Sequence, residues 1–257
     1  MNIVLLLAFF ASGVRPAPVY SPESVVNAAS NRAGPVAPNT IVSVYGQDLA
    51  FVTRALTGSD IRDNTLPTAL GATGVRVTVG GILAPILFVS PTQVNLLVPN
   101  LLLPGPTEIT VMQEGKSGPA VPIQLVSSSP ALFQSSPEFV VASDPSGALF
   151  TSDRPALPGT IVILYATGLG TLEHEFPPGQ LINRASRLKR WREFRVQLDG
   201  RTVEPENLHY VGAAPGFAGV YQINFVVPSW TPIDPEIRVG LDEELSPSGL
   251  KISVRPQ

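Results

Sequence analysis

The sequence contains no cysteine, and this absence excludes disulfide bonds, a thiol nucleophile and cysteine-ligated metal centres. Only two histidines are present, so pairs of a nucleophile with an imidazole base are scarce. Neither a Gly-x-Ser-x-Gly nor a His-Glu-x-x-His motif occurs, and there is no dinucleotide-binding fingerprint. We therefore expect no enzyme, no cofactor and no metal site. Carboxylates that meet only in the folded chain stay open as a remote catalytic alternative.

Charge is also scarce. Charged residues make up only 14% of the sequence, and the net charge of −3 provides no general attraction to nucleic acid or to an anionic membrane. The 27 prolines and 22 glycines are numerous by contrast, which is typical of many short strands joined by turns. The length of 257 residues, of which 44% are hydrophobic, suffices for one or two domains with cores of their own.

Long hydrophobic runs are missing apart from one near the N-terminus. That run, Ile3 to Ala11, is too short to span a bilayer, which takes about 20 residues. It has the length of a signal-peptide core, and Ala11-Ser12-Gly13 provides small residues for cleavage. No Lys or Arg precedes it, so a mis-set start or an ordinary apolar strand is the alternative. We predict a signal peptide and leader over residues 1–20, and a secreted, cell-surface or periplasmic protein.

The sequence repeats itself in two halves. "PNTIVSVYGQDLA" (38–50) aligns with "PGTIVILYATGLG" (158–170), and "VRVTVGG" (75–81) aligns with "FRVQLDG" (194–200). The same order continues through "QVNLLVP" and "QINFVVP", "TEITV" and "PEIRV", and "VPIQLV" and "LKISVR". Because the order of the blocks is preserved throughout, we infer two copies of one domain.

Each copy has the pattern of a β domain. Val75, Val77 and Val79 alternate with Arg76 and Thr78, as in a strand with one buried face. The pairs "GG" and "DG" that end this block are turn signals. No convincing amphipathic helix is found. We predict an all-β protein of two tandem immunoglobulin-like β-sandwiches, at residues 21–127 and 138–257, with a linker at 128–137 and an insertion at 171–193.

Both copies resemble the IPT/TIG domain, an immunoglobulin-like family, and the first follows the order of its motifs. The second copy departs from the family pattern at three points. Asp199-Gly200 replaces the glycine pair, 171–193 is a long insertion, and Gly212 to Val220 is inserted ahead of Gln222. The whole chain also resembles an uncharacterised C-terminal domain family of secreted soil-bacterial proteins, and the resemblance implies a fold and a location without an activity. The motifs that carry both resemblances are Val25 to Ser30, Asn39 to Leu49, Val77 to Gly81, Ser90 to Asn95, Val98-Pro99 and Tyr165 to Gly170.

A recurring set of polar residues accompanies the repeat. A binding site usually occurs once, whereas a fold requirement recurs wherever the fold does, so we interpret this set as a structural signature. The amides are expected to hydrogen-bond loop backbone, such as the Tyr-Gly turn, and the tyrosines to close the sandwich edge. An outward amide pair that contacts a partner or glycan is the alternative. The set comprises Tyr45, Gln93, Asn95, Tyr165, Gln222 and Asn224.

The insertion in the second copy is rich in positive charge. Six cations lie within twelve residues around Trp191, which indicates a site for an anionic partner, although a solvated charged loop is the alternative. We expect a mobile loop whose removal leaves the second sandwich folded. The preceding "EHE" (173–175) has the residue types of a metal or acid–base site, yet neighbouring side chains diverge in an extended loop. The candidate partner-binding residues are Arg187, Lys189, Arg190, Trp191, Arg192 and Phe217.

The predicted function follows from the doubled fold and the lack of a unique polar constellation. It is a non-catalytic, exported structural or adhesion module that contacts a protein or the cell envelope. Its partner is a protein or an anionic or neutral polysaccharide, and not nucleic acid. The main alternative is a carbohydrate-binding module, which needs aromatic rings exposed on one face. The available aromatics are scattered along the chain: Tyr20, Trp191, Tyr210, Phe217 and Trp230.

Overall fold

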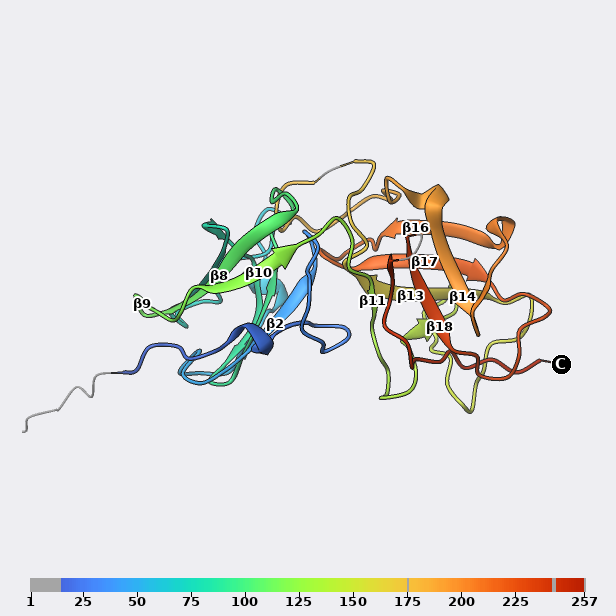
Figure 1. Ribbon diagram of the computed structural model, residues 1–257, viewed down its shortest axis with the longest axis horizontal. Helices are drawn as coiled ribbons and strands as arrows, with labels where there is room; N and C mark the ends of the chain where they lie inside the picture. Colours follow the sequence, from blue (N-terminus) through green and yellow to red (C-terminus); the bar gives the residue numbers. More distant parts are fainter. Residues whose placement is uncertain (1–14, 175, 242–243, 257) are drawn as a thin grey trace, which may run out of the picture.

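The computed structural model describes residues 15–174, 176–241 and 244–256, and these form two β-sandwiches arranged end to end (Figure 1). The strands of the first sandwich are β1 (Val25–Asn27), β2 (Ile41–Tyr45), β3 (Arg54–Ala55), β4 (Val75–Val79), β5 (Ile82–Leu83), β6 (Ile86–Ser90), β7 (Gln93–Leu97), β8 (Gly105–Gln113), β9 (Lys116–Ser117) and β10 (Val121–Leu125). Two short 3₁₀ turns, η1 (Pro22–Ser24) and η2 (Gly58–Asp60), accompany them.

The second sandwich has the same organisation. Its strands are β11 (Ala131–Leu132), β12 (Ala142–Ser143), β13 (Ile161–Thr167), β14 (Phe194–Leu198), β15 (Arg201–Thr202), β16 (Leu208–Ala213), β17 (Tyr221–Val226), β18 (Ile237–Leu241) and β19 (Glu244–Leu245). The turns η3 (Trp191–Glu193) and η4 (Pro205–Asn207) are its 3₁₀ elements. No helix in the described part of the chain is long and apolar enough to cross a membrane.

Two antiparallel sheets enclose the core of each sandwich. In the first, the sheet β1-β2-β7-β6-β3 packs on the sheet β10-β8-β4-β5, and β9 pairs with β8. In the second, β11-β13-β17-β16, with β12 on β13, packs on β15-β14-β18-β19. The alternating apolar residues of the strands meet between the sheets, as Val75, Val77 and Val79 do with no exposed surface. The predicted tandem of immunoglobulin-like sandwiches is therefore confirmed.

Strand register is conserved between the two halves. Val77 of β4 lies opposite Val111 of β8, and the aligned residues Val196 and Val239 lie opposite each other in β14 and β18. The hairpin turns that follow are equivalent too. Gly80 and Gly81 have φ of 56° and 77°, and residues 199 and 200 have 47° and 78°. Two-residue hairpins with positive φ at both positions favour Gly, Asn and Asp, which explains the "GG" and "DG" signals.

The first sandwich begins earlier than predicted. Tyr20 was assigned to the leader, yet its ring is buried in the first core and its hydroxyl donates to the Pro119 carbonyl. Val19 also pairs with Gln47, since each backbone N–H donates to the other residue's carbonyl at 2.9 Å. Residues 15–20 therefore belong to the fold. Most of the predicted signal peptide, residues 1–14, lies outside the described residues.

The segment predicted as a linker contains a short strand of the second sandwich. Ala131 and Leu132 form β11, which pairs with Thr167 and Ala166 of β13, and both are buried. The sequence "SSSPALFQSSP" suggested a linker because it is rich in serine and proline. Its apolar centre nevertheless adds an edge strand to the second sandwich, which therefore starts before residue 138.

The insertion at 171–193 is part of the second core, so the view of it as a solvated charged loop is wrong, and the effect of removing it stays a prediction. Leu172, Ile182 and Leu188 are all buried in the second hydrophobic cluster. Leu172 and Leu188 form an antiparallel bridge, and the Leu188 N–H donates to the Val211 carbonyl of β16 at 2.9 Å. The sequence did not indicate these buried positions, because the apolar residues follow no regular period and lie among many charged residues.

The insertion also reaches the first sandwich. Thr65 and Gln180 form an antiparallel bridge, the Leu66 N–H donates to the Gly179 carbonyl at 2.9 Å, and the Leu181 N–H donates to the Asn64 carbonyl at 2.8 Å. A small third cluster fills the junction, with Leu66, Leu97 and Ala218 buried and Ile41 and Leu181 packed against them. Hydrogen bonds and apolar contacts thus fix the two sandwiches to each other.

Candidate binding site at the domain junction

Three asparagines of the first sandwich donate hydrogen bonds into the second. Asn39 Nδ2 donates to the Tyr221 hydroxyl at 3.3 Å, Asn64 Nδ2 to the Leu181 carbonyl at 2.7 Å, and Asn100 Nδ2 to the Phe176 carbonyl at 2.7 Å. All three lie in connections between strands, where side chains are not committed to a sheet face. These amides position the insertion and β17 against the first sandwich.

Thr167, at the end of β13, links the two halves through one buried hydroxyl. Its Oγ1 accepts from the Ile41 N–H of β2 at 3.0 Å and donates to the Gly219 carbonyl at 2.8 Å. Gly219 sits so close to the first sandwich that a Cβ there would lie 2.3 Å from the Leu97 side chain. Glycine at this position therefore permits the close packing of the junction.

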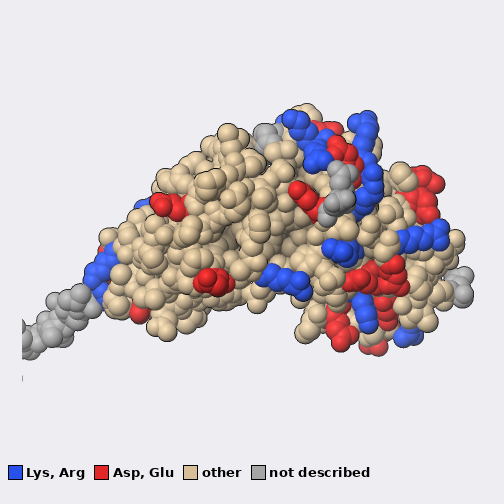
Figure 2. Space-filling model, viewed as in Figure 1, with Lys and Arg blue, Asp and Glu red and all other residues tan. Residues whose placement is uncertain are grey.

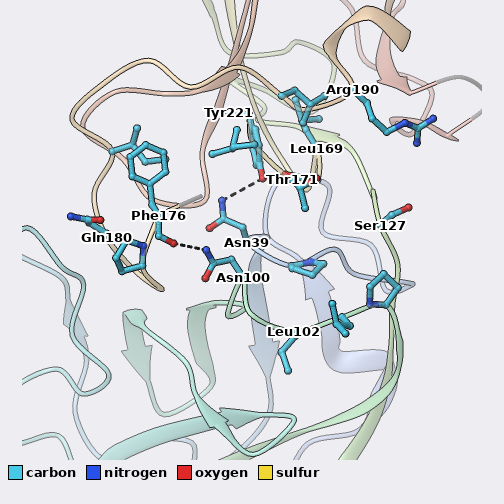
Figure 3. A pocket seen from close by; sticks show the side chains of 18 of the residues that line it. Asn39, Asn100, Leu102, Ser127, Leu169, Thr171, Phe176, Gln180, Arg190 and Tyr221 are labelled. Carbon is cyan, nitrogen blue, oxygen red and sulfur yellow. Dashed lines mark hydrogen bonds between the residues drawn. The ribbon is translucent and has the colours of Figure 1, made fainter. Parts of the chain in front are cut away.

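A cavity of about 180 Å³ opens at this junction (Figure 3). The first sandwich contributes Leu102 and Leu103 to its walls, and the second contributes Leu169, Phe176 and Ile182. Apolar side chains predominate, and the polar groups among them include the side chains of Asn39, Asn100 and Tyr221. Apolar walls with a few fixed polar groups are the usual make-up of a ligand pocket, and domain interfaces are a usual place for one.

The polar atoms of the cavity are unequally satisfied. The Tyr221 hydroxyl donates to the Gly170 carbonyl and accepts from Asn39. Asn100 Oδ1 is buried and has no hydrogen-bond partner among the described residues. A buried acceptor without a donor destabilises the folded state by about 1–3 kcal/mol. The cavity thus offers an acceptor that a bound N–H or O–H group would satisfy.

Positive charge collects beside this cavity, on the insertion. Figure 2 shows a group of Lys and Arg side chains at the top of the second sandwich, while the first sandwich carries little charge on the face shown. Trp191 of η3 lies between two guanidinium groups, with Arg187 4.8 Å and Arg192 4.5 Å from the ring centre. Arg187 also donates to the His209 carbonyl at 3.2 Å. The cations are therefore partly ordered by the aromatic ring and by backbone.

Arg190 connects this cationic face to the cavity. It is the charged residue among the described cavity walls, and its Nε donates to Glu193 Oε2 at 2.8 Å. This bond from Arg190 lowers the pKa of the Glu193 carboxyl below its ordinary value, so Glu193 is ionised at neutral pH. Beneath Arg187, burial raises the pKa of Tyr210, whose hydroxyl donates to backbone carbonyls.

The sequence-predicted partner residues fall on neighbouring loops. Arg187, Lys189, Arg190, Trp191 and Arg192 are consecutive or nearly so in the insertion. The loop that carries Phe217 lies against the insertion, because the Gly216 N–H donates to the Ile182 carbonyl at 2.6 Å and the Ile182 N–H donates to the Phe217 carbonyl at 3.2 Å. The Phe217 side chain is 53% exposed. Their role in binding remains a prediction.

The repeated amides bond differently from the prediction. In both sandwiches the glutamine donates to the asparagine two residues later on the same strand face. Gln93 Nε2 donates to Asn95 Oδ1 at 2.8 Å, and Gln222 Nε2 donates to Asn224 Oδ1 at 2.9 Å. The expected bonds to loop backbone are therefore wrong, because residues i and i+2 of a strand lie side by side and satisfy each other. Tyr45 and Tyr165 are the cross-strand neighbours of the two glutamines: Tyr45 faces Gln93 and Tyr165 faces Gln222.

The aromatic residues do not form one exposed strip. Tyr20 is buried in the first core. The Arg201 guanidinium lies over Trp230, 4.0 Å from the centre of the indole ring. The Trp230 Nε1 donates to Glu204 at 3.0 Å. The hydroxyl of Tyr210 bonds to backbone, and Trp191 is flanked by arginines. Among these aromatic candidates, Phe217 is the ring left most open to a partner.

The candidate metal or acid–base set at 173–175 is only partly described. Residue 175 lies outside the described residues. The backbone N–H of His174 donates to Ser186 Oγ at 3.1 Å, so this stretch is fixed through its main chain. Among the described residues no group of three or more His, Asp or Glu side chains is placed to hold a metal ion.

The sequence reasoning missed the cavity residues, although a weak signal for them exists. Asn39 stands where the second copy has Gly159, and both have positive φ, 63° and 82°. Asn100 likewise follows "VP" where the second copy has Ser229. A side chain retained where the other copy has none, or an amide where the other copy has a hydroxyl, marks a position with a role beyond the common fold.

Comparison with known proteins finds one family model that matches part of the chain, within the first sandwich and the start of the second. Residues 24–134 match the model of the IPT/TIG domain. No curated protein matches the chain. A Bacteroides ovatus mixed-linkage glucan utilization locus protein, SGBP-B, solved with a heptasaccharide, is similar at 11% identity over 92% of this chain and 47% of its own, with a TM-score of 0.36.

Two further solved structures are similar over most of this chain. Domains 5–6 of the S-layer protein SbsC match at 12% identity over 93% of this chain and 99% of theirs, with a TM-score of 0.32. The Escherichia coli adhesin FdeC matches at 12% identity over 93% and 66%, with a TM-score of 0.24. The chain spans less than half the length of the Bacteroides ovatus protein and of a Prevotella bryantii surface glycan-binding protein, 47% and 41%.

Proposed function

We propose that this chain, whose residues 24–134 match the model of the IPT/TIG domain, is a non-catalytic, exported module that makes contacts with a protein or with the cell envelope. The two sandwiches act as one body, because the insertion and three asparagines tie them together at the junction. The contact surface is the cationic face of the insertion, and the partner carries negative charge.

The observation that carries this proposal is the gathering of cations around Trp191 in a protein whose net charge is −3. A cation on an exposed aromatic ring is stabilised by about 0.5–1 kcal/mol. The stacking of Arg187 and Arg192 on Trp191 therefore orders both guanidinium groups before a partner arrives. Less side-chain entropy is then lost on binding than a flexible charged loop would lose.

The test is retention of the purified protein on an immobilised polyanion. Polygalacturonate is a suitable probe, with neutral dextran as the control polymer. We expect retention at about 20 mM salt and its loss at about 500 mM, because added salt shortens the range of the attraction. The double variant Arg187→Gln, Arg192→Gln should be retained about tenfold less, since each lost charge contact weakens binding.

A control exists in the hairpin of β14 and β15, where Arg201 lies opposite Leu198, at the end of β14 away from the insertion. Arg201 stacks on Trp230 as Arg187 does on Trp191, so Arg201→Gln removes one stacked cation away from the proposed surface. This variant should be retained almost as well as the wild type. Retention that changes neither with salt nor with any of these substitutions would overturn the proposal. Retention on dextran would favour a carbohydrate-binding module instead.

A further inference from the structure

We propose that the junction cavity and the cations beside it form one binding site for an acidic protein segment, with a single large apolar side chain of that segment seated in the cavity. The inference rests on the proposed function and adds the class of the partner. Arg190 joins the cavity to the cationic face, because it lines the cavity and is also one of the cations of the insertion.

The walls of the cavity select an uncharged, apolar group. Leu102, Leu169, Phe176 and Ile182 line it from both sandwiches, and Arg190 is the charged residue among its described walls. The volume of about 180 Å³ is the scale of one large side chain rather than of a polymer strand. Aromatic side chains bury the largest apolar area of any residue and are the usual anchors of protein interfaces.

The rim of the cavity favours a protein over a polysaccharide. Leu103 lines the cavity and is 81% exposed, and its neighbour Leu101 is 64% exposed. Single exposed leucines are ordinary. Two of them in the same short loop, one at the mouth of an apolar cavity, suit an apolar partner surface. Sugar hydroxyl groups laid against these leucines would lose their hydrogen bonds to water without replacement.

The polar groups of the cavity suit a peptide backbone. Asn100 Oδ1 is buried without a donor among the described residues, and in Figure 3 the side chains of Asn39 and Asn100 lie next to each other among the residues that line the cavity. A peptide N–H that reached Asn100 would supply the missing donor. In the free protein the unpaired Asn100 oxygen is destabilising. A peptide N–H that bonds to it would relieve this cost, and the relief would strengthen binding.

Charge complementarity fixes what flanks the anchor. Arg184 lies over the ring of Phe176, 5.8 Å from its centre, and Phe176 is a cavity wall. The Lys189 N–H donates to the carbonyl of Thr171, another lining residue, at 2.9 Å. Arg190 thus lines the cavity, Arg184 lies against one of its walls, and the main chain of Lys189 is held beside it, so carboxylates that flank the apolar anchor meet opposite charge.

The test uses the full chain and two synthetic peptides, both acetylated and amidated. One has a central tryptophan flanked on each side by glutamates, and its twin has alanine in place of the tryptophan. Binding is measured by calorimetry at low salt. We expect the tryptophan peptide to bind at least about tenfold more tightly, because a buried aromatic anchor dominates an interface of this kind.

A cavity-filling variant supplies the control. Thr171 is exposed and lines the cavity, so Thr171→Phe places a ring in it from outside the core. Thr202→Phe makes the same change at an exposed position of β15. We expect Thr171→Phe to remove the advantage of the tryptophan peptide and Thr202→Phe to keep it, with both variants unfolding at the wild-type temperature.

The outcomes separate the two proposals. Equal, salt-sensitive binding of the two peptides would overturn the cavity anchor and leave the cationic contact surface standing. Binding to polygalacturonate without binding to either peptide would overturn the protein partner in favour of an anionic polysaccharide. An undiminished tryptophan advantage in Thr171→Phe would place the anchor elsewhere and overturn the inference. Failure of the polyanion and of both peptides would overturn both proposals.

Discussion

Asn100 of the first sandwich donates from Nδ2 to the Phe176 carbonyl of the insertion at 2.7 Å, across 76 residues of sequence. The bond joins the connection after β7 to the insertion, which lies between β13 and β14 of the second sandwich. The insertion is thereby a strap between the sandwiches as well as the carrier of the cations. The proposed contact surface and the junction between the sandwiches therefore share the same segment of the chain.

We predict that Asn100→Ala loosens this strap. The Phe176 carbonyl loses its donor, which costs about 0.5–1.5 kcal/mol, offset in part because the unpaired Oδ1 also disappears. Limited proteolysis should then cut the segment around Phe176 faster than in the wild type. Asn207→Ala is the control. It removes a hydrogen bond from the Asn207 side-chain amide to Glu204 within the second sandwich, and it should leave this cleavage rate unchanged.

Substitutions at two neighbouring residues of the insertion are predicted to change the free energy of unfolding by very different amounts. Leu188 is buried in the second core, so Leu188→Ala should lower the free energy of unfolding by about 2–5 kcal/mol. Lys189 is exposed, and Lys189→Ala should change it by less than about 0.5 kcal/mol. Urea denaturation of both variants makes the measurement. Similar small effects would restore the view of the insertion as a dispensable loop.

The repeat made the fold readable from the sequence. Alternating residues such as Val75, Val77 and Val79 report a buried strand face directly, and two copies of the same pattern support each other. The turn at Gly80-Gly81 adds a local signal that depends on backbone sterics alone. These features depend on residues close in sequence, so their interpretation needed no knowledge of the tertiary contacts.

The candidate site was harder to predict because it exists only where the two halves meet. Asn39 and Tyr221 are 182 residues apart, and nothing local in the sequence indicates that they touch. The burial of Leu172, Ile182 and Leu188 was hidden for the same reason, since an irregular segment packs without a period. The cations were found because charge is visible in composition, whereas the cavity beside them is not.

The junction is predicted to depend on glycine at position 219. Gly219 has φ of 75°, and a Cβ would lie 2.3 Å from the Leu97 side chain. Gly216, in the same loop, has φ of 86° and open space around the added Cβ. Gly216→Ala should therefore lower the free energy of unfolding only by the cost of a left-handed backbone, about 1–2 kcal/mol. Gly219→Ala should lower it by more, because its Cβ also clashes with Leu97. Thermal unfolding compares the two, and equal melting temperatures would rule out a close-packed junction at this point.

Export is predicted from the N-terminal run Ile3 to Ala11, which lies outside the described residues. Arg15 stacks on Phe51, 4.2 Å from its ring centre, so cleavage is expected upstream of it. N-terminal sequencing of the protein from its native source should find Met1 removed and the new terminus between residues 12 and 15. An intact Met1 in a cytoplasmic fraction would contradict both the cleavage and the proposed location.

The repeated amide pairs give the last prediction, which compares Asn95→Ala with Asn224→Ala. Asn95 Oδ1 accepts from Gln93 at 2.8 Å and from the Ser43 hydroxyl at 2.9 Å, and Ser43 is buried. Asn224 Oδ1 accepts from Gln222 at 2.9 Å, and its cross-strand neighbour is Ile163, which has no hydroxyl to donate.

Loss of Asn95 therefore leaves two donors without an acceptor, one of them buried, and loss of Asn224 leaves one. At about 1 kcal/mol for each lost bond, Asn95→Ala should cost roughly 2 kcal/mol and Asn224→Ala roughly 1 kcal/mol. Urea denaturation gives both values, and retention on polygalacturonate should stay at the wild-type level in each variant. A variant that kept its stability but lost retention would show that the amides contact a partner, and the structural role would be abandoned.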